Sequence, residues 1–147
     1  MDKRIQEAVE LFQQVLIYGT ERVLRSVEDP LWKEYSPEQM QVLNIIAKEG
    51  ATTSGRIAML QGVHKSAVSN RLKKLLDKDL LQVLKSEDKR EKLLDLTDKG
   101  REAVKHSNKV LNGYIEKILI NQVDDQEIEQ FLMTFRKLKQ ILKTDGE

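Results

Sequence analysis

The residues with the clearest potential for chemistry are basic side chains gathered in the middle of the sequence. Residues 52–92 contain ten basic and five acidic residues, a balance of +5, whereas the whole 147-residue chain carries only +1. The two flanking segments therefore carry −4 together. A basic segment between acidic ones is typical of a surface that binds a polyanion. On charge alone, a solvated lysine-rich helix face explains the pattern equally well, so the positions of the cations must decide.

Other kinds of site chemistry find little support in the composition. The chain has no cysteine, which excludes disulfides, thiolate zinc sites, iron–sulfur clusters and a cysteine nucleophile. The two histidines, His64 and His106, stand far apart in the sequence, so neither a metal site nor a nucleophile with a histidine base is expected. We interpret His64 as a turn residue and His106 as a surface or interface residue. We therefore expect no enzyme activity, no metal and no cofactor.

Helices must position the basic residues, because the sequence has few residues that break helices. Only 2 prolines and 7 glycines are present. Apolar residues at every third or fourth position, together with cap residues, predict helices from Asp2 to about Val27, from Ser36 to Gly50, from Thr52 or Thr53 to Gly62, from about Lys65 to Asp77, from Thr97 onwards and from Asp124 onwards. Pro30 ends the first helix, and a connection without further helix leads to Ser36.

The predicted helix at residues 65–77 follows a short helix and a turn at Gly62-Val63, which is the pattern of a helix-turn-helix unit. Its outward face carries small and polar residues that can approach base edges in a major groove. These are Ser66, Ala67, Ser69 and Asn70. Four cations around them are expected to neutralise phosphates. These are Lys65, Arg71, Lys73 and Lys74.

Two short apolar segments after this helix predict a β-hairpin with a charged tip. They lie at residues 80–85 and 92–96, and the tip between them contains Asp88, Lys89 and Arg90. Such a hairpin forms a wing whose Lys89 and Arg90 enter the neighbouring minor groove. Asp88 repels phosphate unless it holds Arg90 in a fixed orientation, which is the role we expect for it.

The run from Ser36 to Gly100 resembles the MarR family of bacterial winged-helix regulators. The resemblance rests on Ser36-Pro37-Glu38-Gln39, Lys48-Glu49-Gly50, Gly62-Val63, Lys65-Ser66-Ala67-Val68-Ser69-Asn70-Arg71-Leu72, Asp88-Lys89-Arg90 and Leu96-Thr97-Asp98-Lys99-Gly100-Arg101. The flanking helices fit the family by length and order. The chain departs from the family pattern at His64, where a Ser or Thr cap is usual, and at Asp79, where Gly is usual. Asp tolerates positive φ better than most residues.

The resemblance implies a mainly α fold with a small β-wing. It implies a winged helix-turn-helix domain at residues 31–97 and a helical dimerisation region formed by residues 1–30 and 98–147. It further implies a homodimer that binds a pseudo-palindromic operator in double-stranded DNA, with repression released by a small-molecule effector. Candidate effector contacts are Phe12, Trp32, Tyr35 and Met40, for which packing of the domain junction or the core is the alternative interpretation.

Two other functions remain open from the sequence. A non-regulatory architectural protein would also bind DNA, and salt dependence and operator preference would distinguish it from a regulator. A helical protein-interaction module would explain the terminal helices but not the basic hairpin. The N-terminus mixes acids and bases, and its longest uncharged stretch runs only from Leu11 to Thr20. We therefore expect a cytoplasmic protein that no helix anchors in a membrane.

Overall fold

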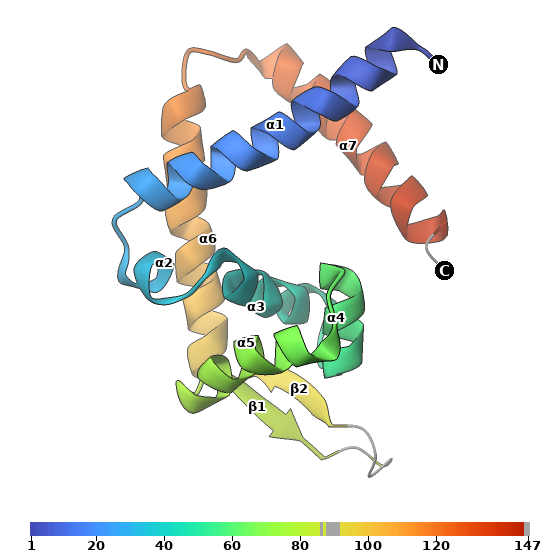
Figure 1. Cartoon of the computed structure of the whole chain (residues 1–147). Helices are drawn as coiled ribbons and strands as arrows, with labels where there is room; N and C mark the ends of the chain where they lie inside the picture. Colours follow the sequence, from blue (N-terminus) through green and yellow to red (C-terminus); the bar gives the residue numbers. More distant parts are fainter. Residues whose placement is uncertain (86, 88–91, 146–147) are drawn as a thin grey trace. The chain divides into compact units, whose positions relative to one another are not determined.

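A computed structural model describes residues 1–85, 87 and 92–145 of the chain (Figure 1). Helices make up most of the described chain, and a two-stranded antiparallel sheet interrupts them before the last two helices. Contacts divide the chain into two compact units, Met1–Leu111 and Asn112–Glu147. The predicted mainly α fold with a small β-wing is confirmed.

The first helix, α1 (Lys3–Ser26), begins after Asp2, whose carboxylate accepts a hydrogen bond from the Arg4 amide at 2.9 Å. All residues of α1 are described, and Val23 alone among them is buried. The apolar side chains expected on more than one face of this helix are therefore largely exposed within one copy of the chain.

A second, short helix follows where the sequence predicted only a connection. In α2 (Pro30–Glu34), Pro30 occupies the first turn and Asp29 is the N-cap, accepting a hydrogen bond from the Leu31 amide at 3.0 Å. The prediction was wrong because proline both ends a helix and begins one. An N–H group in the first turn of a helix has no acceptor within that helix, so the N–H that proline lacks is not needed there. The fixed φ of proline also suits this position.

Three helices then form the centre of the first unit. They are α3 (Pro37–Glu49), α4 (Ser54–Gln61) and α5 (Lys65–Asp77). The predicted capping box at the start of α3 is present, with Ser36 and Gln39 bonded reciprocally at 3.1 and 2.9 Å. Thr53 caps α4, and Gly62 ends it in the left-handed conformation at φ 66°. These local signals explain why the sequence alone located the helices well.

The core of the first unit lies between these helices and the sheet. Its most deeply buried apolar side chains are Val42, Leu43, Ile46, Ile57, Val68, Leu75 and Leu80. Full burial of one such side chain stabilises the fold by about 1.5–3 kcal/mol. Because Val68 and Leu75 are 0% exposed, their burial fixes which side of α5 faces inward and which side remains outside.

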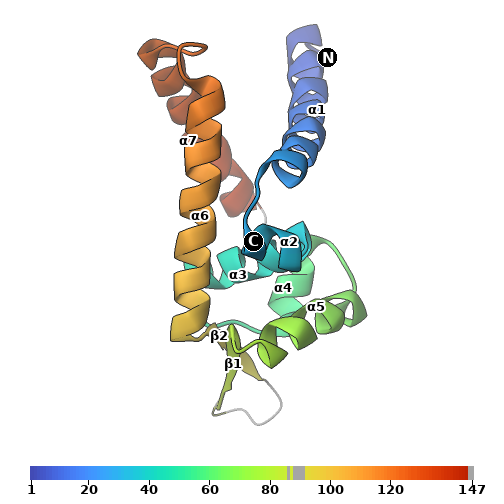
Figure 2. The same cartoon turned by 90° about the vertical axis from the view of Figure 1, so that its left-hand side faces the viewer.

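The predicted hairpin is formed by β1 (Leu81–Leu84) and β2 (Leu93–Leu96), with Leu81 opposite Leu96. Figures 1 and 2 show both strands beside α5 and the first turns of the helix that follows them. Asp79 turns the chain from α5 into β1 at φ 60°, so Asp adopts the left-handed conformation that the family usually assigns to Gly. Thr52 joins the sheet by two backbone hydrogen bonds with Leu94, at 3.0 and 2.7 Å.

The long helix α6 (Asp98–Leu119) starts at the base of the hairpin. The Thr97 hydroxyl accepts a hydrogen bond from the Gly100 amide at 2.9 Å and donates one to the Asp79 carbonyl at 2.6 Å. Gly100 lies so close to the residue before β1 that a Cβ there would stand 2.0 Å from the Leu80 carbonyl oxygen. The first turns of α6 are therefore fixed to the hairpin.

The second unit contains the end of α6 and the last helix, α7 (Asp125–Asp145). Asp124 and Glu127 form the predicted capping box, with hydrogen bonds of 3.2 and 2.8 Å. Phe131 and Phe135 stack with their ring centroids 4.0 Å apart, yet both remain exposed by 38% or more. In the described part of the chain, no helix is long and apolar enough to cross a membrane.

Candidate nucleic-acid interface

One side of α5 is exposed from its first turn to its last. The inward positions are the buried side chains of Val68, Leu72 and Leu75. On the opposite side, exposed residues form a row that we call the outer face of α5. It consists of Lys65, Ser66, Ser69, Asn70 and Lys73. The structure therefore brings five of the residues predicted for DNA contact onto one exposed surface, whereas Ala67 is half-buried beside it.

The polar groups of the outer face differ in the hydrogen bonds that they can offer. The Ser69 hydroxyl donates to the Lys65 carbonyl at 3.0 Å, so its oxygen remains available as an acceptor. Within the described part of the chain, the Asn70 amide has no hydrogen bond and presents a donor and an acceptor together. An exposed asparagine amide of this kind can bind the edge of an adenine through two hydrogen bonds.

The other cations of α5 lie along an edge of the helix and contact the protein itself. The Arg71 guanidinium donates to the Gln61 side chain at 2.6 Å. The Lys74 ammonium stands 4.9 Å from the centre of the Tyr35 ring and donates to the Glu34 carbonyl. The sequence pattern did not separate these inward-bonded cations from the exposed Lys73.

The start of α5 approaches the start of α4 closely. His64 occupies the N-cap of α5, and its side chain makes no capping hydrogen bond. The Lys65 side chain passes over the first turn of α4, where its Cε lies 3.2 Å from the place that a Cβ on Gly55 would take. Glycine at position 55 therefore lets the Lys65 stem lie against α4.

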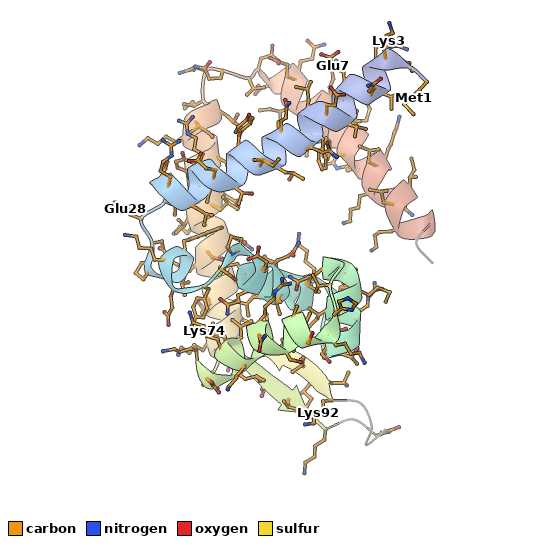
Figure 3. The ribbon with its side chains drawn as sticks, viewed as in Figure 1. Met1, Lys3, Glu7, Glu28, Lys74 and Lys92 are labelled. Atoms are coloured by element: carbon orange, nitrogen blue, oxygen red, sulfur yellow. The ribbon has the colours of Figure 1, made fainter. Side chains whose placement is uncertain are left out.

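The hairpin adds two exposed cations that belong to the basic segment but are not among the residues predicted to contact DNA. Lys85 follows β1, and Lys92, which is labelled in Figure 3, precedes β2. Their position at the strand ends, flanking the charged tip, was the signal that could have identified them. The predicted tip contacts, Asp88, Lys89 and Arg90, lie outside the described residues.

The four candidate effector contacts have different surroundings. Tyr35 and Met40 are buried in the core of the first unit, at 5% and 4% exposure. Burial, together with the nearby Glu34 charge, raises the pKa of the Tyr35 phenol. Phe12 is half-exposed on α1. Trp32 is partly buried, and its indole Nε1 is enclosed without a hydrogen-bond partner in the described structure.

A buried carboxylate connects α2 to α6. Asp29 Oδ2 lies 2.7 Å from Nε2 of His106, which is half-exposed. Burial raises the pKa of Asp29, but the hydrogen bonds from His106 and the Leu31 amide outweigh this effect and leave the pKa below its usual value. His106 thus fixes the cap of α2, and among the described residues no group of three His, Cys, Asp or Glu side chains could hold a metal ion.

Comparison with known proteins places this geometry among DNA-binding regulators. Residues 35–92 match the MarR family model. The chain is 36% identical to YdgG of Bacillus subtilis, an uncharacterized HTH-type transcriptional regulator, over 97% of this chain and 95% of that protein. Its fold is similar to that of a MarR family protein from Bacillus stearothermophilus, with a TM-score of 0.77 and 19% sequence identity. The similarity covers 97% of this chain and 99% of that protein. It is also similar to FabT of Streptococcus pneumoniae in complex with DNA, with a TM-score of 0.65, 26% identity and 97% coverage of each chain.

Proposed function

Because this chain belongs to the MarR family of transcriptional regulators, we propose that it is a repressor that binds a pseudo-palindromic operator as a homodimer and releases it when a small ligand binds. Membership of the family makes the protein a DNA-binding transcriptional regulator. The negative sign of the regulation, the dimer, the ligand and the individual contact residues are the proposal.

The observation that carries the proposal is the outer face of α5. Its small residues, Ser66 and Ser69, keep the first turns of the helix narrow, so that this end can enter a major groove. Asn70 then reads base edges, while Lys65 and Lys73 at the two ends of the row neutralise phosphates. A solvated lysine-rich face has no need for an exposed amide next to two small residues.

The hairpin supplies the second contact region. Lys85 and Lys92 stand exposed at the strand ends next to β1 and β2, and the chain between them contains Lys89 and Arg90. We assign Lys89 and Arg90 to the minor groove beside the major groove that α5 enters, and Lys85 and Lys92 to the flanking phosphates.

The homodimer is supported by apolar rows on α1 and α7 whose side chains are largely exposed. On α1, Ile5, Val9, Phe12 and Leu16 follow one another at helical spacing and are each at least 50% exposed. On α7 the corresponding row is Ile128, Phe131, Phe135, Leu138 and Ile141, each at least 38% exposed. Apolar rows of this size are too costly to leave in water, and we assign their burial to a second copy of the chain. A two-fold dimer also matches a pseudo-palindromic operator.

The ligand site is proposed near Trp32. The enclosed indole Nε1 is a donor that has no partner in the described structure, and a buried donor left unpaired costs about 1–3 kcal/mol. A ligand with a hydrogen-bond acceptor next to an apolar ring satisfies this donor. We assign Phe12, which is half-exposed on α1, to an apolar contact with the ligand, whereas Tyr35 and Met40 belong to the buried core.

A selection experiment tests the repressor proposal. Random duplexes are bound by the protein, and we expect enrichment of a two-fold symmetric motif with half-sites about one helical turn apart. Fluorescence anisotropy then gives the Kd for this motif and for a scrambled duplex at several salt concentrations, with an expected preference of at least about 10³-fold. An architectural DNA-binding protein would show the salt dependence without the preference.

The sign of regulation and the ligand need separate measurements. In transcription with purified RNA polymerase, a promoter carrying the selected motif should yield less transcript when the protein is added, and an increase would identify an activator. Because the chain has a single tryptophan, ligands from a chemically diverse library can be detected by the Trp32 fluorescence. A ligand that changes this fluorescence should also release the operator duplex.

A further inference from the structure

We propose that Lys74 is a positioning residue, which fixes α5 against α2 and leaves phosphate neutralisation to its neighbour Lys73. The inference rests on the proposed function, because it concerns how α5 is presented to DNA. It separates two adjacent lysines that have the same charge and lie on the same helix.

The contacts of Lys74 all lead toward α2. Its ammonium is 4.9 Å from the centre of the Tyr35 ring and donates to the backbone carbonyl of Glu34. Tyr35 is 5% exposed, so the ring is a fixed part of the core and cannot follow the lysine outward. At the residue that follows α5, the Lys78 ammonium forms an ion pair with the Glu34 carboxylate at 3.6 Å.

These contacts hold the Lys74 ammonium in one place. A lysine near an aromatic face is stabilised by the ring quadrupole, and the stabilisation grows as water is excluded. To reach a phosphate, Lys74 has to give up both the ring and the Glu34 carbonyl. Lys73 makes no such exchange, because its side chain is exposed on the outer face and has no interaction within the described structure.

A second anchor on the same edge of α5 supports a positioning role. Arg71, three residues before Lys74, donates to Gln61 at 2.6 Å. The Gln61 amide in turn donates to the Glu38 carbonyl at 3.0 Å and to the Gln41 side chain at 2.9 Å. Residues three apart lie on the same side of a helix, so the two anchors together resist rotation of α5 about its axis.

The two anchors determine the direction in which the outer face of α5 points. Rotation of α5 would swing Asn70 and Ser69 away from the base edges that they read, even if every phosphate contact remained. A helix that is already fixed in the right direction loses less conformational freedom on binding. Lys74 therefore strengthens DNA binding through the arrangement of α5 and not through a contact with phosphate.

The test compares Lys73→Ala with Lys74→Ala by measuring the Kd for operator DNA over a range of salt concentrations. We expect Lys73→Ala to reduce the slope of log Kd against log salt by about one unit per protomer. We expect Lys74→Ala to raise the Kd by about fivefold with the slope unchanged, as the loss of a partly buried cation–π contact predicts. Lys74→Arg should restore the Kd, because a guanidinium also stacks on an aromatic ring.

A second variant removes the ring without changing any charge. Tyr35→Leu should raise the Kd about as much as Lys74→Ala, and the double variant should be no weaker than either single one, because both remove the same contact. Circular dichroism melting of each variant shows that the compared proteins are folded.

Each outcome decides a different point. A slope reduced by about one unit in Lys74→Ala, or additive effects of Lys74→Ala and Tyr35→Leu, would overturn the positioning role. So would a Kd for Lys74→Ala equal to that of the unchanged protein. If instead Lys73→Ala leaves the slope unchanged, the outer face of α5 does not contact phosphate, and the proposed function is wrong at this helix whatever Lys74 does.

Discussion

Gly100→Ala tests the fixed connection between the hairpin and α6. A Cβ at this position would stand 2.0 Å from the Leu80 carbonyl oxygen, 3.0 Å from the Leu80 carbonyl carbon and 3.3 Å from a methyl carbon of Leu96. The first two atoms belong to the backbone, so no side-chain rotation can relieve the contact. The first turn of α6 or the strand that follows Leu80 must move.

The expected magnitude follows from two opposing effects. Forcing an extra carbon into a filled site costs about 1–3 kcal/mol, and the short distance to a backbone atom places this site at the upper end. Alanine regains up to about 1 kcal/mol over glycine in a helix. We expect Gly100→Ala to lower the free energy of unfolding by about 2 kcal/mol, and to weaken DNA binding because the hairpin shifts relative to α5.

Gly113→Ala is the matched control, because it makes the same change in the same helix. A Cβ at Gly113 meets nothing within 4 Å, so only the helix propensity acts and the variant should gain up to about 1 kcal/mol. Urea unfolding followed by circular dichroism measures both variants, at one protomer concentration because dimerisation contributes to stability. If Gly100→Ala proves as stable as Gly113→Ala, the close approach of α6 to Leu80 is not a constraint on the fold.

Three further predictions concern the dimer, the base contacts and the response to pH. Phe135→Asp places an unpaired charge in the proposed dimer contact at a cost of several kcal/mol, so light scattering should report monomers; a mass of two chains would contradict the interface. Asn70→Ala should change the base preference in a duplex selection, whereas Lys73→Ala should weaken all duplexes alike, and the opposite result would mean that α5 faces the groove differently. Asp29 has a lowered pKa, so its ionised form stabilises the fold above the unfolded pKa of about 3.9, and this contribution is lost as the pH falls through the folded pKa. Asp29→Asn weakens the contact to His106, so it should lower the free energy of unfolding by about 1 kcal/mol at neutral pH. On acidification, the variant should lose less of its free energy of unfolding than the unchanged protein. Parallel curves of unfolding free energy against pH for the two proteins would contradict the role of Asp29.

The helix-turn-helix unit could be predicted from the sequence because its signals are local. Ser36 and Gln39 form the capping box, and Gly62 takes the left-handed conformation, as their residue types and spacing indicate. The exposed position of Asn70 followed from the same helical period that buries Val68. Such features depend on residues within a few positions of one another, so periodicity and cap chemistry are sufficient to find them.

Features that depend on distant residues could not be predicted in this way. Lys73 and Lys74 are the same residue type side by side, and only the packing of α2 against α5 distinguishes them. The helix that begins at Pro30 carries an ambiguous signal, because the same proline that ends α1 also suits the first turn of α2. The bond between His106 and Asp29 joins residues 77 positions apart, and no spacing rule could have paired them.

The bridge between Thr52 and Leu94 determines how the hairpin moves. Leu94 exchanges two backbone hydrogen bonds with Thr52 on one side of β2, while β1 pairs with the other side. The Leu94 amide therefore has Thr52 on one side and β1 on the other, which protects it from water. Thr52 also leads directly into Thr53, the cap of α4. In deuterium exchange, the Leu94 and Thr52 amides should be among the slowest of the hairpin region and should exchange together with the core helices. We therefore expect the base of the wing to tilt as a rigid body with α4 and α5 and not to hinge at β2.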